Sequence, residues 1–346
     1  MAQVHSRAAR AAGAITAVLA SSTPERGFAA AQDLGIERAA AGVAELLAED
    51  VDIVHVCTPN ATHAELALEV IRAGVHVICE KPLATRSEDA RALAAAEERG
   101  LVAAVPFVYR YHPMVREARA RVAAGEIGEL LTVDCGYLQD WMLRPGDDDW
   151  RVTAADGGPS RAFADIGSHL CDLLEFVAGE RIARLTARTR RVYDERGGRP
   201  VTNEDAVSIL VEMASGAIGT LLISQMAAGR KNALTLELHG AQASLRFDQE
   251  RPEELWIGQR EGSRQLFRDP ETAHPGVARF STVPAGHAQG YQDAFNGFVA
   301  DAYAAIRGEG LPDGLPTFQD GVRAAQLTEA VLLAAREERW VDTPVS

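Results

Sequence analysis

The sequence predicts an α/β domain with a doubly wound parallel sheet, followed by an α+β domain built on a large, mostly antiparallel open sheet. Three observations lead to this fold class. The chain has 346 residues, a length that fits about two domains. Short apolar runs alternate with amphipathic helical patterns in the first third of the chain. From about Glu129 onward, longer strands of alternating polarity replace them.

The first domain is predicted over residues 1–112. Uninterrupted apolar strands that alternate with amphipathic helices are typical of a parallel sheet covered on both faces. Gly74 and Gly100 each follow a helical pattern and suit a left-handed helix end. The expected strands lie at residues 14–19, 51–57, 75–79 and 101–107, and the expected helices at 24–35, 40–50, 61–74 and 87–100.

The front of this domain is shorter than a Rossmann sheet requires. Such a sheet opens with a strand and a G-x-G-x-x-G turn, and neither precedes residue 14. Residues 1–13 instead predict the helix that follows the turn, and residues 14–19 the second strand. We therefore expect the first strand and glycine loop to be missing, as a start codon chosen too late would cause. A weak signal peptide is the alternative interpretation of the same residues.

The second domain is predicted over residues 113–346. Its strands alternate between apolar and polar residues, which indicates an antiparallel sheet with one solvated face. A helical segment at 163–179 interrupts the series, and helices near 288–307 and 317–338 close the chain and could return to the first domain. The expected strands lie at residues 130–139, 182–193, 205–214, 217–226, 234–240 and 243–248.

Composition argues against several classes of function. The net charge of −14 disfavours a nucleic-acid-binding surface and binding to anionic membranes. No uncharged apolar stretch reaches the length of about 18 residues that suggests a membrane span. The four cysteines form no C-x-x-C pair, so we expect reduced thiols in a cytoplasmic protein. No metal site is expected, and the acidic stretch at 146–150 is interpreted as a surface loop.

Lysine is rare in this chain, which has 35 Lys and Arg residues but only two lysines, Lys81 and Lys231. Lys81 follows the apolar run 75–79, at the sheet edge where open α/β sheets bind ligands. Arginine stays protonated, so a lysine here indicates a need for a compact cation that can exchange a proton. A solvated loop lysine is the simpler alternative.

Asp165 and His169 are four residues apart in the predicted helix 163–179 and would share one of its faces. A histidine can accept a hydroxyl proton, and the aspartate could orient the substrate or tune the basic groups near it. The alternative interpretation is a histidine that packs against the helix beside a capping aspartate.

The end of the second strand bears on the choice of dinucleotide. In NAD enzymes this position carries an acidic residue that binds the ribose hydroxyls. Here the positions are Ser21 and Ser22, with Arg26 close by, a combination that could accept a 2′-phosphate. The stretch therefore favours NADP over NAD, unless it is an ordinary turn at a helix start.

Five short motifs are found along the chain: CTPNATH at 57–63, CEKPLA at 79–84, YRYHP at 109–113, ADIGSHLCD at 164–172 and VPAGHAQGYQDAF at 283–295. In this combination they resemble the glucose–fructose oxidoreductase, inositol dehydrogenase and MocA (Gfo/Idh/MocA) family. The resemblance covers nearly the whole chain and implies a Rossmann domain, a C-terminal domain with a large open sheet, and oxidation of sugars or cyclitols.

The resemblance also implies roles for individual residues. Catalysis would fall to Lys81, Asp165 and His169. For His63, a structural role at a helix start is an equal alternative to cofactor contact. The expected cofactor site consists of Ser21, Ser22, Arg26, Thr58, Pro59, Asn60, His63, Glu80 and Lys81.

A further cluster suggests the substrate. Gln139 and Trp141 end a strand, and a flat aromatic beside hydrogen-bonding groups suits a pyranose ring. This stretch is similar to levoglucosan and other pyranose 3-dehydrogenases of the family; a polar strand end with a half-buried Trp is the alternative. The expected substrate site consists of Tyr109, Arg110, Tyr137, Gln139, Trp141, Arg151, Asp165, His169 and His287.

These observations favour an NAD(P)-dependent oxidoreductase that moves a hydride between nicotinamide and a secondary alcohol of a pyranose, glycoside or cyclitol. Two alternatives remain open: a glycosidase that oxidises its substrate transiently, and a protein that senses sugar or nucleotide without catalysis. In the resembling family the open sheet forms oligomers, so we expect a homodimer or homotetramer.

Overall fold

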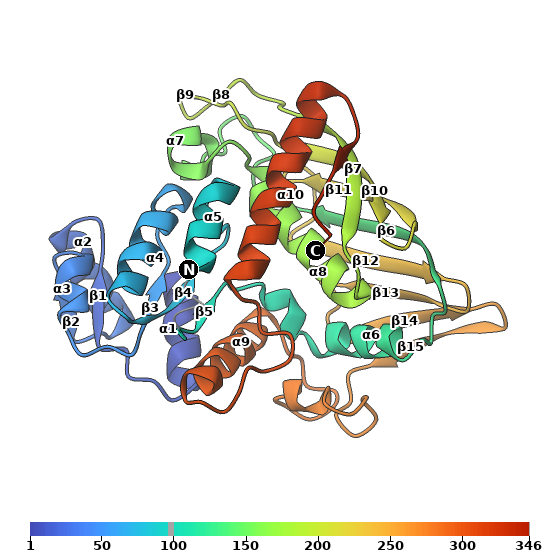
Figure 1. Ribbon diagram of the computed structural model, residues 1–346, viewed down its shortest axis with the longest axis horizontal. Helices are drawn as coiled ribbons and strands as arrows, with labels where there is room; N and C mark the ends of the chain where they lie inside the picture. Colours follow the sequence, from blue (N-terminus) through green and yellow to red (C-terminus); the bar gives the residue numbers. More distant parts are fainter. Residues whose placement is uncertain (96–99, 346) are drawn as a thin grey trace. The chain divides into compact units, whose positions relative to one another are not determined.

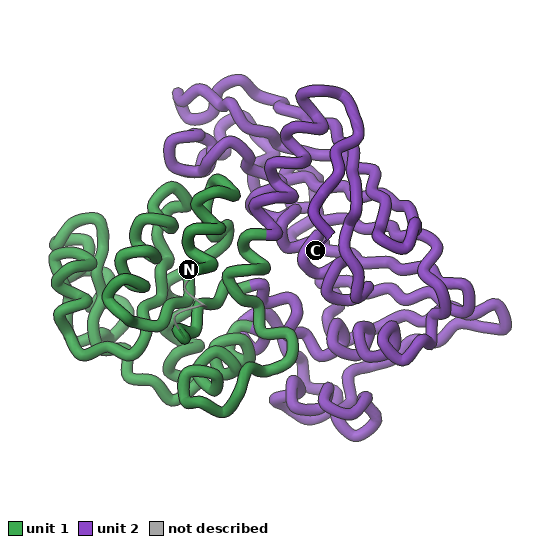
Figure 2. Tube along the Cα trace, viewed as in Figure 1, with its two compact units in different colours: residues 1–106, 295–322 green, residues 107–294, 323–346 purple. Residues whose placement is uncertain are grey.

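The computed structural model describes residues 1–95 and 100–345, which fall into two compact units (Figures 1 and 2). The first unit contains residues 1–106 and 295–322, and the second contains residues 107–294 and 323–346. The chain therefore returns to the first unit after the second has been built. Among the described residues, no helix has the length and apolar character needed to cross a membrane.

The parallel sheet of the first unit is in two pieces. β1 (Val18–Ala20) pairs with β2 (Arg38–Ala40), and β4 (His76–Cys79) lies between β3 (Ile53–Val56) and β5 (Ala103–Ala104). A Rossmann sheet has the order 3-2-1-4-5-6, in which strand 1 separates the strands that correspond here to β1 and β3. No segment of the described chain forms that strand, and β1-β2 and β3-β4-β5 accordingly lie in separate sheets.

The helices of the first unit largely follow the predicted pattern. α2 begins at a Thr23 side chain that accepts a hydrogen bond from Arg26 N, and it ends at Gly35 in the left-handed region. Gly74 has a φ of +78° after α4, as expected. The predicted helix 87–100 reaches into residues 96–99, outside the described part. The helices are α1 (Ala2–Ala11), α2 (Pro24–Leu34), α3 (Val43–Leu47), α4 (His63–Arg72), α5 (Ser87–Ala94) and, mostly in this unit, α9 (Tyr291–Ile306).

The second unit is built on a nine-stranded sheet of order β15-β14-β13-β12-β6-β11-β10-β7-β16. β6 and β11 are parallel and the other neighbours antiparallel, which confirms the expected mostly antiparallel sheet. The strands are β6 (Leu130–Leu138), β7 (Ile182–Arg190), β10 (Ala206–Met213), β11 (Ile218–Ser224), β12 (Ala233–Gly240), β13 (Ser244–Asp248), β14 (Glu254–Gln259), β15 (Gly262–Phe267) and β16 (Val341–Asp342), with a small hairpin of β8 (Glu195–Arg196) and β9 (Arg199–Pro200).

Helices cover one face of this sheet. α6 (Pro113–Ala123), α8 (Ser168–Ala178) and the later part of α10 (Phe318–Glu337) contribute to a single apolar core with the inward side chains of the strands. Leu210, Ile218 and Leu222 point to the other face and are 49%, 59% and 48% exposed. The sheet is therefore open on one side, as the alternating pattern predicts.

The helical segment 163–179 is not one regular helix. Residues Phe163–Gly167 form a π-helical turn, and α8 follows from Ser168. A Cβ on Gly167 would lie 2.5 Å from the ring of Phe163, so this position requires glycine. The sequence prediction missed the π turn because periodicity alone does not separate it from an α-helix.

Candidate active site

Three side-chain amides lie side by side at the edge of the large sheet that is formed by the ends of its three central strands, β12, β6 and β11. β11 runs parallel to β6 with Ser224 opposite Leu138, and β12 runs antiparallel to β6 with Ala233 opposite Leu138. The next residues outward, Gln139, Gln225 and Asn232, are therefore neighbours, although they are distant in the sequence. Sheet register places them together, and the prediction included only Gln139.

Asn232 is at the centre of a hydrogen-bond network on this edge. Its Oδ1 accepts from Tyr137 OH at 2.7 Å and from Gln139 Nε2 at 2.9 Å, and its Nδ2 donates to Tyr109 OH at 3.1 Å. The two tyrosine hydroxyls also bond to each other. Gln139 Oε1 accepts in turn from Trp141 Nε1 at 2.8 Å. The network thus joins four expected substrate residues through one that sequence reasoning missed.

Burial changes the acidity of both tyrosines in this network. It raises the pKa of Tyr109, although its hydrogen bonds to Tyr137 and Asn232 oppose the rise. It raises the pKa of Tyr137 further, with the Tyr109 hydroxyl acting in the same direction. Both hydroxyls therefore stay protonated at neutral pH and can serve as donors and acceptors.

Asp165 lies beside this network and is held from two sides. Gln225, whose side chain is buried, donates from Nε2 to Asp165 Oδ2 at 2.9 Å. Arg151 Nε lies 3.5 Å from Asp165 Oδ1, and its guanidinium also contacts Asp149 at 3.0 Å and the ring of Trp150. The carboxylate is 14% exposed, so it is fixed in place without being sealed from solvent.

His169 follows Asp165 by one helical step. Its ring is buried and stands edge-on to the rings of Tyr109 and Phe107, with centroids 5.0 and 5.6 Å apart. Since Tyr109 also bonds to Asn232, the histidine contacts the network through the Tyr109 ring. Within the second unit, the structure thus brings Asp165 and His169 together with Tyr109, Tyr137 and the amides.

Two expected substrate residues have other surroundings. Arg110 makes a bidentate ion pair with Asp172 through Nε and Nη2, and its side chain is 8% exposed and stacked on Phe176. His287 is exposed in a loop, where its carbonyl oxygen accepts a hydrogen bond from Arg268. Arg110 therefore has a packing role here, and we do not include either residue in the substrate site proposed below.

In the first unit, His63 ties together the loops that follow β3 and β4. Its Nε2 lies 2.8 Å from the carbonyl oxygen of Thr58, and its Nδ1 lies 2.8 Å from that of Pro82. Lys81 immediately precedes Pro82 in the second of these loops, and the peptide bond between them is cis. Burial lowers the pKa of His63, although both carbonyl contacts oppose this. Through its two carbonyl contacts, His63 connects these loops and helps to fix the one that carries Lys81.

Glu80 is held by a buried histidine that sequence reasoning missed. His5 Nε2 on α1 lies 3.1 Å from Glu80 Oε1, and Glu80 Oε2 accepts from Lys81 N at 3.0 Å. Burial opposes a charge on His5, but Cys57 and Glu80 outweigh it and raise its pKa to about 10. Burial would also raise the pKa of Glu80, but His5 and then Lys81 lower it to about 2. The two side chains therefore form a buried ion pair that contacts the backbone of Lys81.

The chain's other expected cofactor residues lie in loops that follow β1 and β3. Arg26 Nη1 donates to Ser22 Oγ at 3.2 Å just after β1, with Ser21 next to them. Thr58, Pro59 and a buried Asn60 follow β3, and Thr58 Oγ1 accepts from Thr62 Oγ1 at 2.7 Å. Carboxyl ends of parallel strands are where such sheets bind dinucleotides. The residues present fit the nicotinamide and ribose parts of a cofactor, while the described chain has no glycine-rich turn for the pyrophosphate.

Comparisons with known proteins agree with this geometry. Residues 1–107 match the model of an oxidoreductase family with an NAD-binding Rossmann fold, and residues 115–246 match that of the GFO/IDH/MocA C-terminal domain. Levoglucosan dehydrogenase from Pseudarthrobacter phenanthrenivorans is 32% identical, over 94% of this chain and 89% of that protein.

Solved structures give the same result. Levoglucosan dehydrogenase in complex with NADH and levoglucosan is 31% identical with a TM-score of 0.93, over 99% of this chain and 97% of that one. An inositol dehydrogenase homolog from Azotobacter vinelandii, complexed with NAD⁺, is 28% identical with a TM-score of 0.89, over 98% and 93%. The chain therefore belongs to the GFO/IDH/MocA family of oxidoreductases, as its motifs predict.

Proposed function

We propose that the protein oxidises a secondary alcohol of a pyranose sugar, glycoside or cyclitol with a nicotinamide cofactor. The observation that carries the proposal is the edge of the large sheet, where Gln225 bonds to Asp165, the Tyr109 ring contacts His169, and Asn232 joins Tyr109 to Gln139. Such a wall can hold several hydroxyl groups of one ring and orient a single C–OH toward a base. Transient-oxidation glycosidases and non-catalytic sensors are not favoured by the dehydrogenases among its relatives.

The chain's own residues would manage the proton. A bound nicotinamide would supply the acceptor for the hydride that leaves the substrate carbon. His169 accepts the hydroxyl proton, directly or by way of Lys81, and Asp165 orients the hydroxyl while Gln225 and Arg151 hold its carboxylate still. The Lys81 ammonium stabilises the charge that develops on the oxygen. Gln139, Trp141 and Arg151 hold the rest of the ring.

The cofactor preference is proposed to be for NADP. Support comes from Ser21 and Ser22, which stand where NAD enzymes carry a carboxylate, and from Arg26, which lies within hydrogen-bond distance of Ser22. The relatives described above were solved with NADH or NAD⁺, so both dinucleotides have to be compared directly.

The test is a substrate screen with the purified protein. Levoglucosan, glucose, glucosides, galactose and inositols are each offered with NAD⁺ or NADP⁺, and reduced cofactor is followed by absorbance. Turnover of one group of related sugars is expected. Silence across the panel, from a protein that still binds cofactor, would contradict the proposal.

We also propose a homodimer or homotetramer formed through the open face of the large sheet. Leu210, Ile218 and Leu222 form an exposed apolar surface on two neighbouring strands. The exposure of such a surface to water is unfavourable, and it is typical of an interaction site. Light scattering at micromolar concentration should give a multiple of the chain mass, and Leu210→Glu should reduce it.

We place the protein in the cytoplasm because all four cysteines are free.

A further inference from the structure

The start of the segment that carries Asp165 and His169 is capped by a residue from a distant loop. Glu204 Oε1 accepts hydrogen bonds from Arg161 N at 3.1 Å and from Phe163 N at 2.9 Å, and the main-chain oxygen of Glu204 accepts from Ala162 N at 3.3 Å. The next amide, Ala164 N, donates to Ser160 Oγ at 3.2 Å, and Ser160 Oγ itself donates to Glu204 at 2.7 Å. Intrahelical bonding begins with Asp165 N, which donates to Arg161 O.

A helix leaves its first four N–H groups without intrahelical partners. Here one residue, some forty positions later in the chain, satisfies three of them and orients the serine that satisfies the fourth. Local N-caps are Ser, Thr, Asp or Asn immediately before a helix. A cap supplied from another element does more, because it fixes where the helix start lies relative to that element.

The residues on both sides of Glu204 hold the same region. Asn203 Nδ2 donates to the carbonyl oxygen of Arg151 at 2.8 Å, and the Asp205 carboxylate pairs with the buried Arg161 guanidinium. Asp205 O also accepts from Gln225 N at 3.1 Å, and Gln225 in turn bonds to Asp165. The loop 203–205 therefore contacts each support of the Asp165 carboxylate.

We propose that Glu204 is a positioning residue for the oxidation chemistry, which it serves by capping the segment that carries Asp165 and His169. The inference rests on the proposed function, since it concerns the residues that handle the substrate hydroxyl. Glu204 touches neither substrate nor cofactor in this role. Its contribution is to keep the carboxylate and imidazole within the small displacement that catalysis tolerates.

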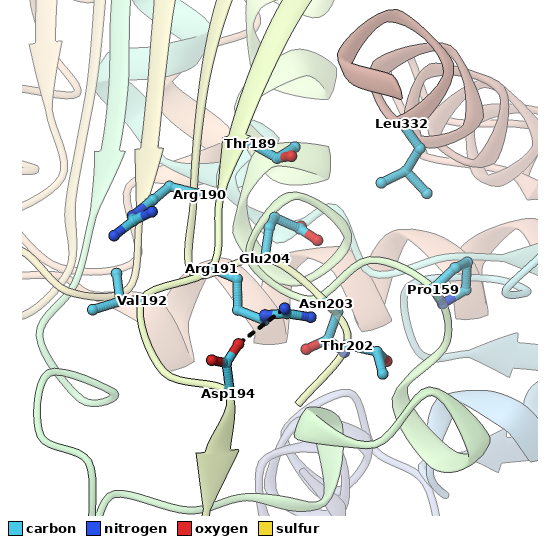
Figure 3. Close-up of a pocket in the computed structure, with 10 residues that line it drawn as sticks. All are labelled: Pro159, Thr189, Arg190, Arg191, Val192, Asp194, Thr202, Asn203, Glu204 and Leu332. Carbon is cyan, nitrogen blue, oxygen red and sulfur yellow. Dashed lines mark ion pairs between the residues drawn. The ribbon is translucent and has the colours of Figure 1, made fainter. Parts of the chain in front are cut away.

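The surroundings of Glu204 make this testable. Asn203 and Glu204 line a pocket of about 500 Å³, with the Arg191–Asp194 ion pair on its wall (Figure 3). Water from this pocket can occupy the space of a shortened side chain, so we expect Glu204→Ala to fold. Glu175 offers a matched control: it is an equally buried carboxylate in α8, later in the same helical segment, where it accepts from Ile182 N at 2.9 Å and pairs with Arg323.

Steady-state kinetics of Glu204→Ala, Glu204→Gln and Glu175→Ala test the proposal. Glu204→Ala should lower kcat about 10- to 100-fold with sugar KM changed less than about 3-fold, because the ring-binding residues are on other elements. Glu204→Gln keeps an acceptor oxygen and should restore kcat to within about 3-fold of the wild type. Glu175→Ala should lower the melting temperature while kcat per folded enzyme stays within about 2-fold.

Several results would overturn the proposal. They are an unchanged kcat in folded Glu204→Ala, an equal loss of kcat in Glu175→Ala, or no rescue by glutamine. If Glu204→Ala does not fold, Ser160→Ala removes part of the same cap: a kcat lowered about 3- to 10-fold supports the role, and an unchanged kcat contradicts it.

Hydrogen exchange separates this inference from the proposed function. If the wild type turns over none of the sugars, the proposed function fails, but the cap can still be examined. Amide exchange at Arg161, Phe163 and Ala164 should be slow in the wild type and accelerate in Glu204→Ala and not in Glu175→Ala, whereas Ala162 N keeps its main-chain partner in all three proteins. Equal exchange at these amides in all three proteins would show that Glu204 does not cap the segment.

Discussion

The two units hold their functional side chains in different ways. In the second unit, residues from three strands meet at one level of a continuous sheet, and Asn232 joins Tyr109, Tyr137 and Gln139 in one network. In the first unit, the sheet is in two pieces, and the functional loops are held by two histidines, His63 and His5. Substrate residues thus depend on sheet register, whereas cofactor residues depend on single buried contacts.

This difference has a consequence for substitutions. A network with several members can lose one and keep the others near their places, so its loss should appear gradually. Lys81, by contrast, is the only lysine in the sequence of the first unit, so no second lysine of that unit can replace it. The largest effects should therefore come from the first unit's loop residue, and the effects of supporting residues should be smaller.

Lys81→Ala should have the largest effect. Removing an ammonium that stabilises developing charge and exchanges a proton should lower kcat about 10³-fold. Lys81→Arg should be nearly as impaired, since arginine remains protonated and has a different shape. Steady-state turnover measures both, and cofactor binding by fluorescence should be retained.

The chain's other lysine is the control for this prediction. Lys231 is 76% exposed and pairs with Asp140 at 2.7 Å. Because exposed ion pairs contribute little, Lys231→Ala should leave turnover within about 2-fold of the wild type. Comparable losses in both lysine variants, or an active Lys81→Ala enzyme, would remove Lys81 from catalysis.

Asn232→Ala tests the network of the second unit. The change removes three hydrogen bonds and leaves two buried tyrosine hydroxyls with fewer partners, which should lower the free energy of unfolding by about 2–4 kcal/mol. Because Gln139 loses its anchor, the KM for the sugar should rise about 5- to 20-fold while kcat falls less.

Gln242→Ala serves as the control, since this exposed amide lies just beyond the other end of β12. Denaturant titration and steady-state kinetics are the two measurements. A sugar KM in Asn232→Ala equal to that of Gln242→Ala would show that the network does not hold the ring.

Much of the fold follows from sequence periodicity. Several strands that the sequence did not predict, or predicted too long, have a physical reason for the difference. β15 went unpredicted because nearly all of its residues are exposed, so it shows no alternation of polarity. β16 has two residues, too few for any period. The strand predicted at 14–19 begins only at Val18, and Ile15 within it is 91% exposed.

The candidate site shows the same limit. Lys81, Asp165 and His169 stand in recognisable motifs, so sequence identifies them as candidates. Gln225, Asn232 and Glu204 are ordinary polar residues at strand ends, and only register brings them to the same edge. His5 gives no signal because its partner Glu80 is seventy-five positions away. Pairings between distant segments are what sequence patterns do not contain.

The His5–Glu80 ion pair predicts how stability depends on pH. Glu80 has its pKa lowered from 4.5 to about 2, so its contribution is present above pH 4.5 and is lost as the pH falls toward 2. His5 has its pKa raised from 6.5 to about 10 by Cys57 and then by Glu80, so its contribution is present below pH 6.5 and is lost as the pH rises toward 10. The pair should stabilise the protein most between about pH 4.5 and 6.5.

Thermal melting of His5→Gln between pH 5 and 9.5 checks this prediction. Glutamine can donate to Glu80 but does not titrate, so the variant should melt lower at pH 6 and lose less stability toward pH 9.5. His239→Gln, at a half-exposed histidine of the second unit that bonds to Ser244, should follow the wild-type curve. Parallel curves for wild type and His5→Gln would show that this pair does not set the pH dependence.

The smallest effect is expected at Arg26, which concerns the preference for one dinucleotide over the other. If Arg26 binds a 2′-phosphate, Arg26→Ala should raise the KM for NADP by only about 5- to 10-fold, because an exposed charge contributes modestly. The KM for NAD, which has no 2′-phosphate, should stay unchanged. Ser22→Asp should act further in the same direction, since a carboxylate there repels the phosphate and accepts hydrogen bonds from ribose hydroxyls. The ratio of kcat/KM for the two cofactors is the measurement. Equal losses with NAD and NADP in Arg26→Ala would assign this arginine to the turn rather than to the phosphate, and would leave Ser21 and Ser22 without a reason to favour NADP.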